Sequence, residues 1–164
     1  DLDELTKKCI PHLEKVSGGL SFANLAEDRP PLTFEWLKKV VALEQERLKK
    51  LSEIGEMTEF FFKDKLKYEP RLLVWKKMNF EQVKENLGKI EKILSQLEKK
   101  DFEKEKIKSA LEPLAKEQGR GEVFWPLRVA LTGRPASPGP FEVAEVLGKE
   151  KTLKRIREAK TILG

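Results

Sequence analysis

Apolar residues recur in steps of three and four along most of this chain, which is the spacing of one face of an α-helix. The clearest run consists of Val83, Leu87, Ile90, Leu94 and Leu97. No stretch alternates apolar and polar residues as a half-buried strand does, and there is no internal repeat. The pattern therefore predicts an all-α fold of about eight helices, several of them short.

Capping residues, prolines and glycines mark where these helices should begin and end. Thr33 is a candidate N-cap for a helix whose apolar residues run from Phe34 to Leu51. Pro126 suits the first turn of a short helix that reaches Thr132, with Gly133 as the residue after it. The segment from Phe141 to Leu147 repeats this plan before a last helix.

Two loop-rich stretches divide the helical pattern. Ser17–Pro31 follows an N-terminal helix and contains paired glycines and paired prolines. Tyr68–Phe80 contains Glu69-Pro70 and is the better domain boundary. We therefore predict two consecutive helical units, residues 1–75 and residues 76–164.

Length and composition are those of a globular chain with a highly charged surface. The chain has 164 residues, of which 39% are hydrophobic and 37% charged, enough for a real core. Because it begins with Asp1, we expect a processed chain or an excised piece of a longer one. Nothing at the start of the sequence looks like a signal peptide, and no apolar run approaches the length needed to cross a membrane. The single cysteine, Cys9, excludes an internal disulfide, so we expect the reducing cytoplasm. We also expect a monomer.

The residues that usually perform catalysis are missing or isolated. His12 is the only histidine, and it lies three residues after Cys9 without the further ligands that a zinc site needs. Nothing orients a Cys–His nucleophile pair, so a buried thiol and a surface imidazole are the simpler interpretation. Gly18-Gly19 is not followed by Lys-Ser/Thr, as a phosphate-binding loop would be. We predict no catalytic residue, metal ligand or cofactor site in this chain.

Positive charge is gathered near the C-terminus. The net charge of the whole chain is only +5, because 28 acidic residues accompany 33 basic ones. From Lys149 to Lys160, however, six bases stand against two acids. This helix is a candidate for phosphate contacts, with Lys149 and Lys151 among them. The alternative is a solvated helix face, which is just as common.

The loop between the two short helices is the other candidate for contact with RNA. Three prolines stiffen it, a glycine permits close backbone approach, and an aromatic at its end could stack on an unpaired base. The candidates are Arg128, Arg134, Pro138, Gly139, Pro140 and Phe141. The alternative is a structural corner in which Phe141 belongs to the core, and general chemistry slightly favours it.

Arg47 is a candidate of a different kind, because it follows Val40 by seven residues and so lies at the edge of an apolar helix face. An arginine there can be half-buried with its guanidinium held in one direction. The commoner outcome is a surface ion pair with Glu44 or Glu46. The aromatic run Phe60–Phe62 and the tryptophans are better explained as core.

Three sequence motifs carry a family resemblance. They are Trp125-Pro-Leu-Arg-Val-Ala-Leu-Thr-Gly133, Ser137-Pro-Gly-Pro-Phe141 and Leu147-Gly-Lys-Glu150. In order and spacing this region resembles the C-terminal anticodon-binding region of bacterial glutamyl-tRNA synthetases. Glu46-Arg47-Leu48-Lys-Lys-Leu51 is similar to part of the family's first anticodon-binding unit. The family's ATP-site signatures, a His-Ile-Gly-His-like motif and a Lys-Met-Ser-Lys-Ser-like loop, are absent.

The resemblance implies a function and a set of partners. The family joins glutamate to its tRNA in a catalytic half that uses ATP and magnesium, so this chain by itself should need no cofactor and should not be an enzyme. Its partners would be the anticodon loop of glutamate tRNA and the catalytic half of the same enzyme. Arg47 would inspect the third anticodon base, and the loop from Arg134 to Phe141 would lie near the first.

Two other functions are compatible with the residues alone. One is an enzyme of unrecognised type, against which the lone histidine and the missing phosphate loop argue. The other is a helical protein-interaction module that does not bind RNA, which the leucine and isoleucine stripes and the Lys/Glu faces would suit. Binding to an anticodon stem-loop separates the RNA-binding hypothesis from both.

Overall fold

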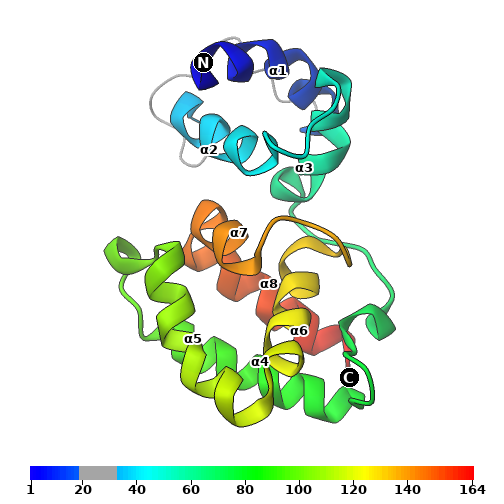
Figure 1. The fold of residues 1–164 in the computed structure, drawn as a ribbon. Helices are drawn as coiled ribbons and strands as arrows, with labels where there is room; N and C mark the ends of the chain where they lie inside the picture. Colours follow the sequence, from blue (N-terminus) through cyan, green and yellow to red (C-terminus); the bar gives the residue numbers. More distant parts are fainter. Residues whose placement is uncertain (19–32) are drawn as a thin grey trace. The chain divides into compact units, whose positions relative to one another are not determined.

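The computed structural model describes residues 1–18 and 33–164 of the chain. Within these residues it contains eight α-helices, three short 3-10 helices and no strand, which confirms the predicted all-α fold (Figure 1). Most of the loop predicted at Ser17–Pro31 lies outside the described residues. In the described part of the chain, no helix has both the length and the apolar character that crossing a bilayer requires.

The chain forms two compact units, Asp1–Asp64 and Lys65–Gly164. The first unit is built from α1 (Leu2–Val16), α2 (Phe34–Glu44), the 3-10 helix η1 (Leu51–Glu53) and α3 (Ile54–Phe62). Its three α-helices contact one another around a core of fully buried side chains. These side chains are Cys9, Leu13, Leu37, Val41 and Ile54.

Helix α2 begins where the sequence predicts but ends earlier. The Thr33 hydroxyl accepts a hydrogen bond from the backbone N–H of Trp36 at 3.1 Å, which confirms Thr33 as the N-cap. The helix ends at Glu44, whose carbonyl accepts from the N–H groups of both Arg47 and Leu48. The expected continuation to Leu51 is therefore wrong, and Arg47 lies in a turn instead of on a helix face.

The Glu53 side chain explains why α2 ends early, because it takes backbone donors that a longer helix would use. The Glu53 carboxylate accepts from the backbone N–H groups of Lys49 and Lys50, each at 3.2 Å. Those bonds start the next element, η1, and withdraw two donors that a longer α2 would need. Apolar spacing does not reveal this, because Leu48 and Leu51 pack on the core of the first unit although they lie beyond the end of α2.

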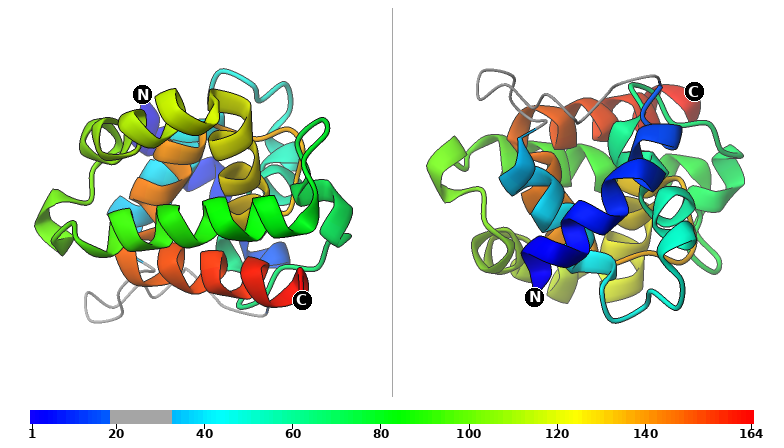
Figure 2. Two further views of the ribbon diagram at one scale, coloured as in Figure 1. Left: turned by 90° about the horizontal axis from the view of Figure 1, so that it is seen from below. Right: turned by 90° about the horizontal axis from the view of Figure 1, so that it is seen from above.

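The second unit holds the remaining five α-helices. They are α4 (Phe80–Ser95), α5 (Lys104–Gln118), α6 (Arg120–Thr132), α7 (Pro140–Leu147) and α8 (Lys149–Ile162), with the 3-10 helices η2 (Pro70–Leu73) and η3 (Lys99–Asp101). Helix α6 contacts each of the other four. Helices α4 and α8 lie side by side (Figure 2). The loop and the basic helix predicted for RNA binding thus both adjoin α6.

Helix α6 is longer than predicted, and Pro126 lies inside it and not in its first turn. A proline within a helix has no N–H to donate, so the carbonyl four residues earlier, that of Glu122, loses its partner. The side-chain amide of Asn86, a buried residue of α4, donates to that carbonyl at 3.0 Å. A donor from a neighbouring helix thus replaces the missing backbone bond.

The segment that precedes α4 belongs to the second unit, because it is anchored along α6. The indole N–H of Trp125 donates to the carbonyl of Leu72 at 2.8 Å, and the rings of Trp75 and Trp125 pack with centroids 5.3 Å apart. Leu73 is fully buried. These contacts place the observed boundary at residues 64–65, earlier than the predicted boundary near residue 75.

Candidate nucleic-acid interface

The proline-rich loop between α6 and α7 begins and ends at glycines. Gly133 has φ +68° and its N–H donates to the carbonyl of Val129 at 2.7 Å, which confirms it as the residue that ends α6. Gly139 is the N-cap of α7, where its carbonyl accepts from the N–H of Val143 at 3.0 Å. The loop thus joins two helix ends of defined geometry.

Arg128 holds the far half of this loop. Its Nη1 donates to the carbonyl of Ser137 at 2.7 Å, to the Ser137 hydroxyl at 2.9 Å and to the carbonyl of Pro138 at 3.2 Å. Nη1 carries two hydrogens, so at least one of them is shared between two of these acceptors. Arg128, predicted as a phosphate contact, is therefore committed at Nη1 to the loop itself.

Thr132 holds the near half. It lies one turn after Arg128, and its hydroxyl donates to the Arg128 carbonyl at 2.8 Å. The same oxygen accepts from the backbone N–H of Arg134 at 3.1 Å. The last turn of α6 thereby fixes both halves of the loop, so the loop has a preformed shape.

The loop residues differ in how much of each is accessible. Pro135 and Ala136 are exposed, and Arg134 and Gly139 are half-buried. Pro138 and Pro140, which were predicted to meet RNA, are buried. The accessible part of this loop is therefore its start, from Arg134 to Ala136, together with the backbone at Gly139.

Phe141 lies on the first turn of α7 and is half-buried. Its ring meets that of Phe124 edge to face, with centroids 5.0 Å apart and an interplanar angle of 87°. The Arg120 guanidinium lies over the Phe124 ring, 5.3 Å from its centroid. This is the packing of the structural corner that the sequence left open as an alternative for Phe141.

The basic residues of α8 are mostly used inside the second unit. Arg155 is buried, and its Nη1 donates at 2.6 Å to the carbonyl of Leu131 in the last turn of α6. A cation there also opposes the partial negative charge at the C-terminal end of that helix. Lys149, a predicted contact, donates from Nζ to the carbonyl of Ser95 at 2.9 Å.

Two further bases of α8 share one carboxylate on α4. Arg157 and Lys160 both form ion pairs with Glu91, whose side chain is 18% exposed. Desolvation by burial would raise the pKa of Glu91, but the hydrogen bonds and the positive charges of Lys160 and Arg157 together outweigh it and lower that pKa. Lys154 pairs with Glu158 at 3.6 Å. Lys151, the other predicted contact, is half-buried on the same helix.

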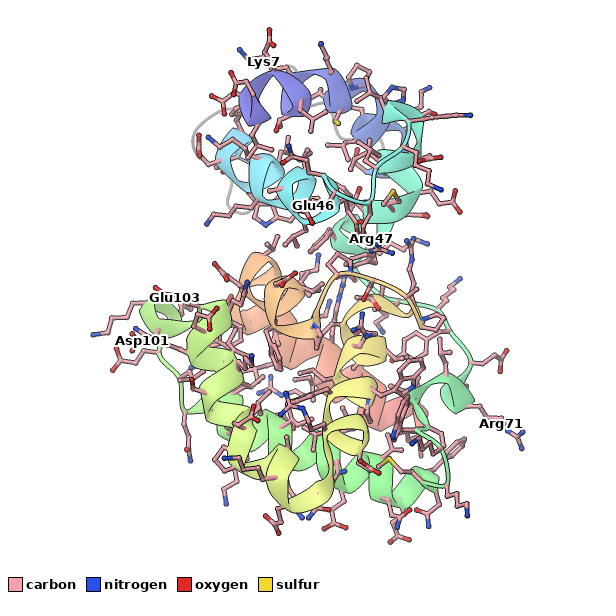
Figure 3. The ribbon with its side chains drawn as sticks, viewed as in Figure 1. Lys7, Glu46, Arg47, Arg71, Asp101 and Glu103 are labelled. Carbon is pink, nitrogen blue, oxygen red and sulfur yellow. The ribbon has the colours of Figure 1, made fainter. Side chains whose placement is uncertain are left out.

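Arg47 lies in the first unit, in the turn that follows α2 (Figure 3). Its Nη1 forms an ion pair with the buried carboxylate of Glu44 at 3.2 Å, which is one of the two pairs the sequence suggested. The Arg47 side chain remains 45% exposed. One edge of the guanidinium is therefore oriented by Glu44, while much of the side chain is accessible.

One group of bases was missed from the sequence. Between residues 65 and 77, five bases stand against one acid, a net charge of +4. All five bases are exposed: Lys65, Lys67, Arg71, Lys76 and Lys77. A charge count along the chain would have found them. They were missed because this stretch lacks the apolar spacing of a helix and resembles a linker.

Comparison with known proteins bears on what this arrangement is for. A family model described as an anticodon binding domain matches residues 4–160, nearly the whole chain. The chain belongs to this family. It is homologous to the C-terminal region of bacterial glutamate–tRNA ligases, as the resemblance predicted.

Two relatives show how far the similarity extends. The anticodon binding domain is 36% identical over 166 residues to glutamate–tRNA ligase 1 of Caldicellulosiruptor saccharolyticus, a match that covers 98% of this chain and 32% of that protein. It is 35% identical over 160 residues to the glutamate–tRNA ligase of Bacillus licheniformis, covering 95% of this chain and 30% of that protein. The chain thus spans about a third of the length of the curated relatives it matches.

A solved structure agrees with the sequence comparison. The fold is similar, with a TM-score of 0.73 and 26% sequence identity, to a glutamate tRNA ligase from Elizabethkingia meningosepticum in complex with its amino acid. That similarity covers 97% of this chain and 30% of the ligase chain. The anticodon binding domain therefore has the fold of the corresponding part of a complete ligase.

Proposed function

We propose that this anticodon binding domain holds the anticodon loop of glutamate tRNA, as part of a ligase whose catalytic half joins glutamate to that tRNA with ATP and magnesium. The observation that carries the proposal is the family match over residues 4–160. The domain itself needs neither ATP nor magnesium in this scheme and acts as a cytoplasmic monomer that contacts the catalytic half of its own enzyme.

The loop between α6 and α7 suits a role near the first anticodon base. Arg128 and Thr132 already hold it in shape, so little conformational entropy remains to be lost when RNA binds. Its accessible start at Arg134–Ala136 offers a cation and backbone groups, which can meet phosphate and the edge of an unstacked base. In this proposal Arg128, Pro138, Pro140 and Phe141 support the loop from within.

Arg47 suits a role at the third anticodon base. Glutamate anticodons end in cytosine, whose O2 and N3 are adjacent acceptors, and a guanidinium offers only donors. Glutamine anticodons end in guanine, which presents N1–H and N2–H donors that an arginine cannot accept. The ion pair with Glu44 would orient the guanidinium before RNA arrives.

The test is binding of the 164-residue chain to the anticodon stem-loop of glutamate tRNA and to stem-loops with substituted anticodons. Preference for the glutamate anticodon, with an affinity that falls as salt rises, is the expected result. Equal affinity for all the stem-loops, or none, would favour the protein-interaction module instead. The chain alone should show no glutamate-dependent exchange of ATP and pyrophosphate.

Gly139→Val tests the loop within the same assay. The backbone of Gly139 has φ −56°, which any residue adopts, and an added Cβ would lie 3.6 Å from the nearest Glu142 atom, an ordinary contact. The variant should fold while the added side chain obstructs RNA from approaching the backbone there. Unchanged affinity in the folded variant would mean that Gly139 lies outside the RNA contact.

A further inference from the structure

The segment that joins the two units carries a row of exposed bases along α6. Leu66 and Tyr68 lie against Gly133, where an added Cβ would be 3.8 Å from Leu66 and 3.1 Å from Tyr68. Lys65 and Lys67, which alternate with them, are exposed. The apolar side chains therefore attach this segment to the end of α6 while the lysines remain in solvent.

The same segment is attached twice more toward the start of α6. Trp125 binds the carbonyl of Leu72, and Trp75 packs so close to Gly121 that an added Cβ would be 2.1 Å from its indole nitrogen. From Gly121 to Gly133 a helix rises about 18 Å. Lys67 and Arg71 lie between these attachment points, and Lys65 directly precedes the first of them. These bases are thus held on a rigid support of that length and not on a flexible linker.

The bases of this segment differ from those of α8 in what they contact. Among the described residues, no carboxylate lies within ion-pair distance of Lys65, Lys67 or Arg71, whereas Arg157 and Lys160 of α8 are both paired with Glu91. Figure 3 shows the Arg71 side chain extending from η2 away from the helices of its unit. These three bases keep their charge available for an external anion.

The last two bases of the segment are less suited to an anion. Lys76 Nζ lies over the ring of Trp75, 5.2 Å from its centroid. Lys76 and Lys77 also line a surface hollow with Trp75, Gln82 and Glu122, and the Glu122 carboxylate would repel a phosphate there. The row that fits a polyanion is therefore Lys65, Lys67 and Arg71, which we call the basic strip.

We infer that the basic strip is a second RNA contact, which binds phosphates of the same tRNA outside the anticodon bases. A row of cations on a rigid support matches a phosphate backbone, which repeats its charge at regular intervals. Cations that touch phosphates strengthen binding without reading the sequence. The inference rests on the proposed function, because it takes glutamate tRNA as the partner.

The test replaces all three bases with glutamine in the 164-residue chain (Lys65→Gln, Lys67→Gln, Arg71→Gln). The matched control replaces three exposed lysines of α1 that also lack an ion-pair partner among the described residues (Lys7→Gln, Lys8→Gln, Lys15→Gln), so net charge falls equally. All six side chains are on the surface, and unfolding in urea verifies that both variants keep the native stability.

Binding to glutamate tRNA and to an anticodon-substituted version is then measured across a series of salt concentrations. Each lost phosphate contact removes about 0.7–0.9 from the slope of log affinity against log salt, so the strip variant should lose about 2–3. Its affinity should fall by the same factor for both tRNAs, and the control should keep the native slope.

One outcome would overturn the inference and leave the proposed function standing. In that outcome the native chain discriminates between the two tRNAs, but the strip and control variants have equal slopes of log affinity against log salt. A strip variant that loses discrimination but keeps its slope would also overturn it, because the bases would then read sequence. A native chain that binds neither tRNA would overturn the proposed function, and the inference with it.

Discussion

At the scale of single residues, arginines that look alike in the sequence have different environments. Arg128 donates to two loop carbonyls, and Arg155 is buried against the carbonyl of Leu131. Arg71 is exposed, and no carboxylate among the described residues pairs with it. The first two support the fold, while Arg71 remains available to a partner. Charge counted along the chain gives both segments a net +4, although Arg155, Arg157 and Lys160 of α8 are engaged inside the second unit and the bases before α4 are exposed.

Arg47 provides a prediction at this scale. Arg47→Gln replaces a group that only donates by an amide that both donates and accepts, so it should tolerate guanine as well as cytosine at the third anticodon position. We expect the native chain to prefer cytosine by about 1–3 kcal/mol and the variant to lose most of that preference. Binding of cytosine- and guanine-ended anticodon stem-loops to both proteins measures it. A variant that keeps the full preference would show that Arg47 does not read this base.

Tyr68 provides a prediction about pH. Burial, and to a lesser degree the negative charge of Glu158, raise the pKa of Tyr68 to about 12, although Arg155 acts in the opposite direction. In the unfolded chain the phenol ionises near pH 10. Above that pH the unfolded state holds fewer protons than the folded state, so this residue's contribution to stability is lost between about pH 10 and 12.

The chain has a single tyrosine, so its phenolate absorbance reports this group alone. The titration midpoint should lie near 12 in the folded chain and near 10 in urea. The native chain should also lose more stability between pH 10 and 12 than Tyr68→Phe does, while lysine ionisation affects both proteins equally. A folded-state midpoint near 10 would contradict the buried environment of the phenol.

At the scale of secondary-structure elements, α6 depends on a bond from outside itself. Asn86→Ala should destabilise the chain by about 1–3 kcal/mol, because the Glu122 carbonyl then has neither a backbone nor a side-chain donor. In a Pro126→Ala background the new backbone N–H can donate to that carbonyl, so Asn86→Ala should cost clearly less. Urea unfolding of the four proteins in this double-mutant cycle measures the coupling. Additive losses would mean that Asn86 does not compensate for the proline.

At the scale of the whole molecule, the boundary between the units determines which pieces fold. A piece that spans residues 65–164 contains all the contacts of the second unit and should unfold cooperatively by itself. A piece that spans residues 76–164, as the sequence predicted, lacks Tyr68, Leu73 and Trp75. Removing one fully buried leucine side chain already costs about 2–5 kcal/mol, so the shorter piece should be less stable by at least that amount. Equal urea midpoints for the two pieces would support a boundary near residue 75.

The sequence by itself determined the helical class, the position of most helices and the ends that have local signals. Thr33 begins α2 through its own hydroxyl, and Gly133 ends α6 because glycine adopts a positive φ without strain. Three sequence motifs in the last third of the chain also identified the family. These are properties of neighbouring residues, which periodicity, caps and motif order report directly.

Tertiary structure decided what depends on residues far apart in the chain. Inside α6, the donor that Pro126 cannot provide comes from Asn86, forty residues earlier in the chain. Three bases of α8 are engaged inside the second unit, because Glu91 pairs with Arg157 and Lys160 and the end of α6 accepts from Arg155. The basic strip is presented outward because Trp75 and Trp125 attach its segment to α6. No local pattern contains these partners, because a charge or a proline acquires its role only from the atoms that folding places beside it.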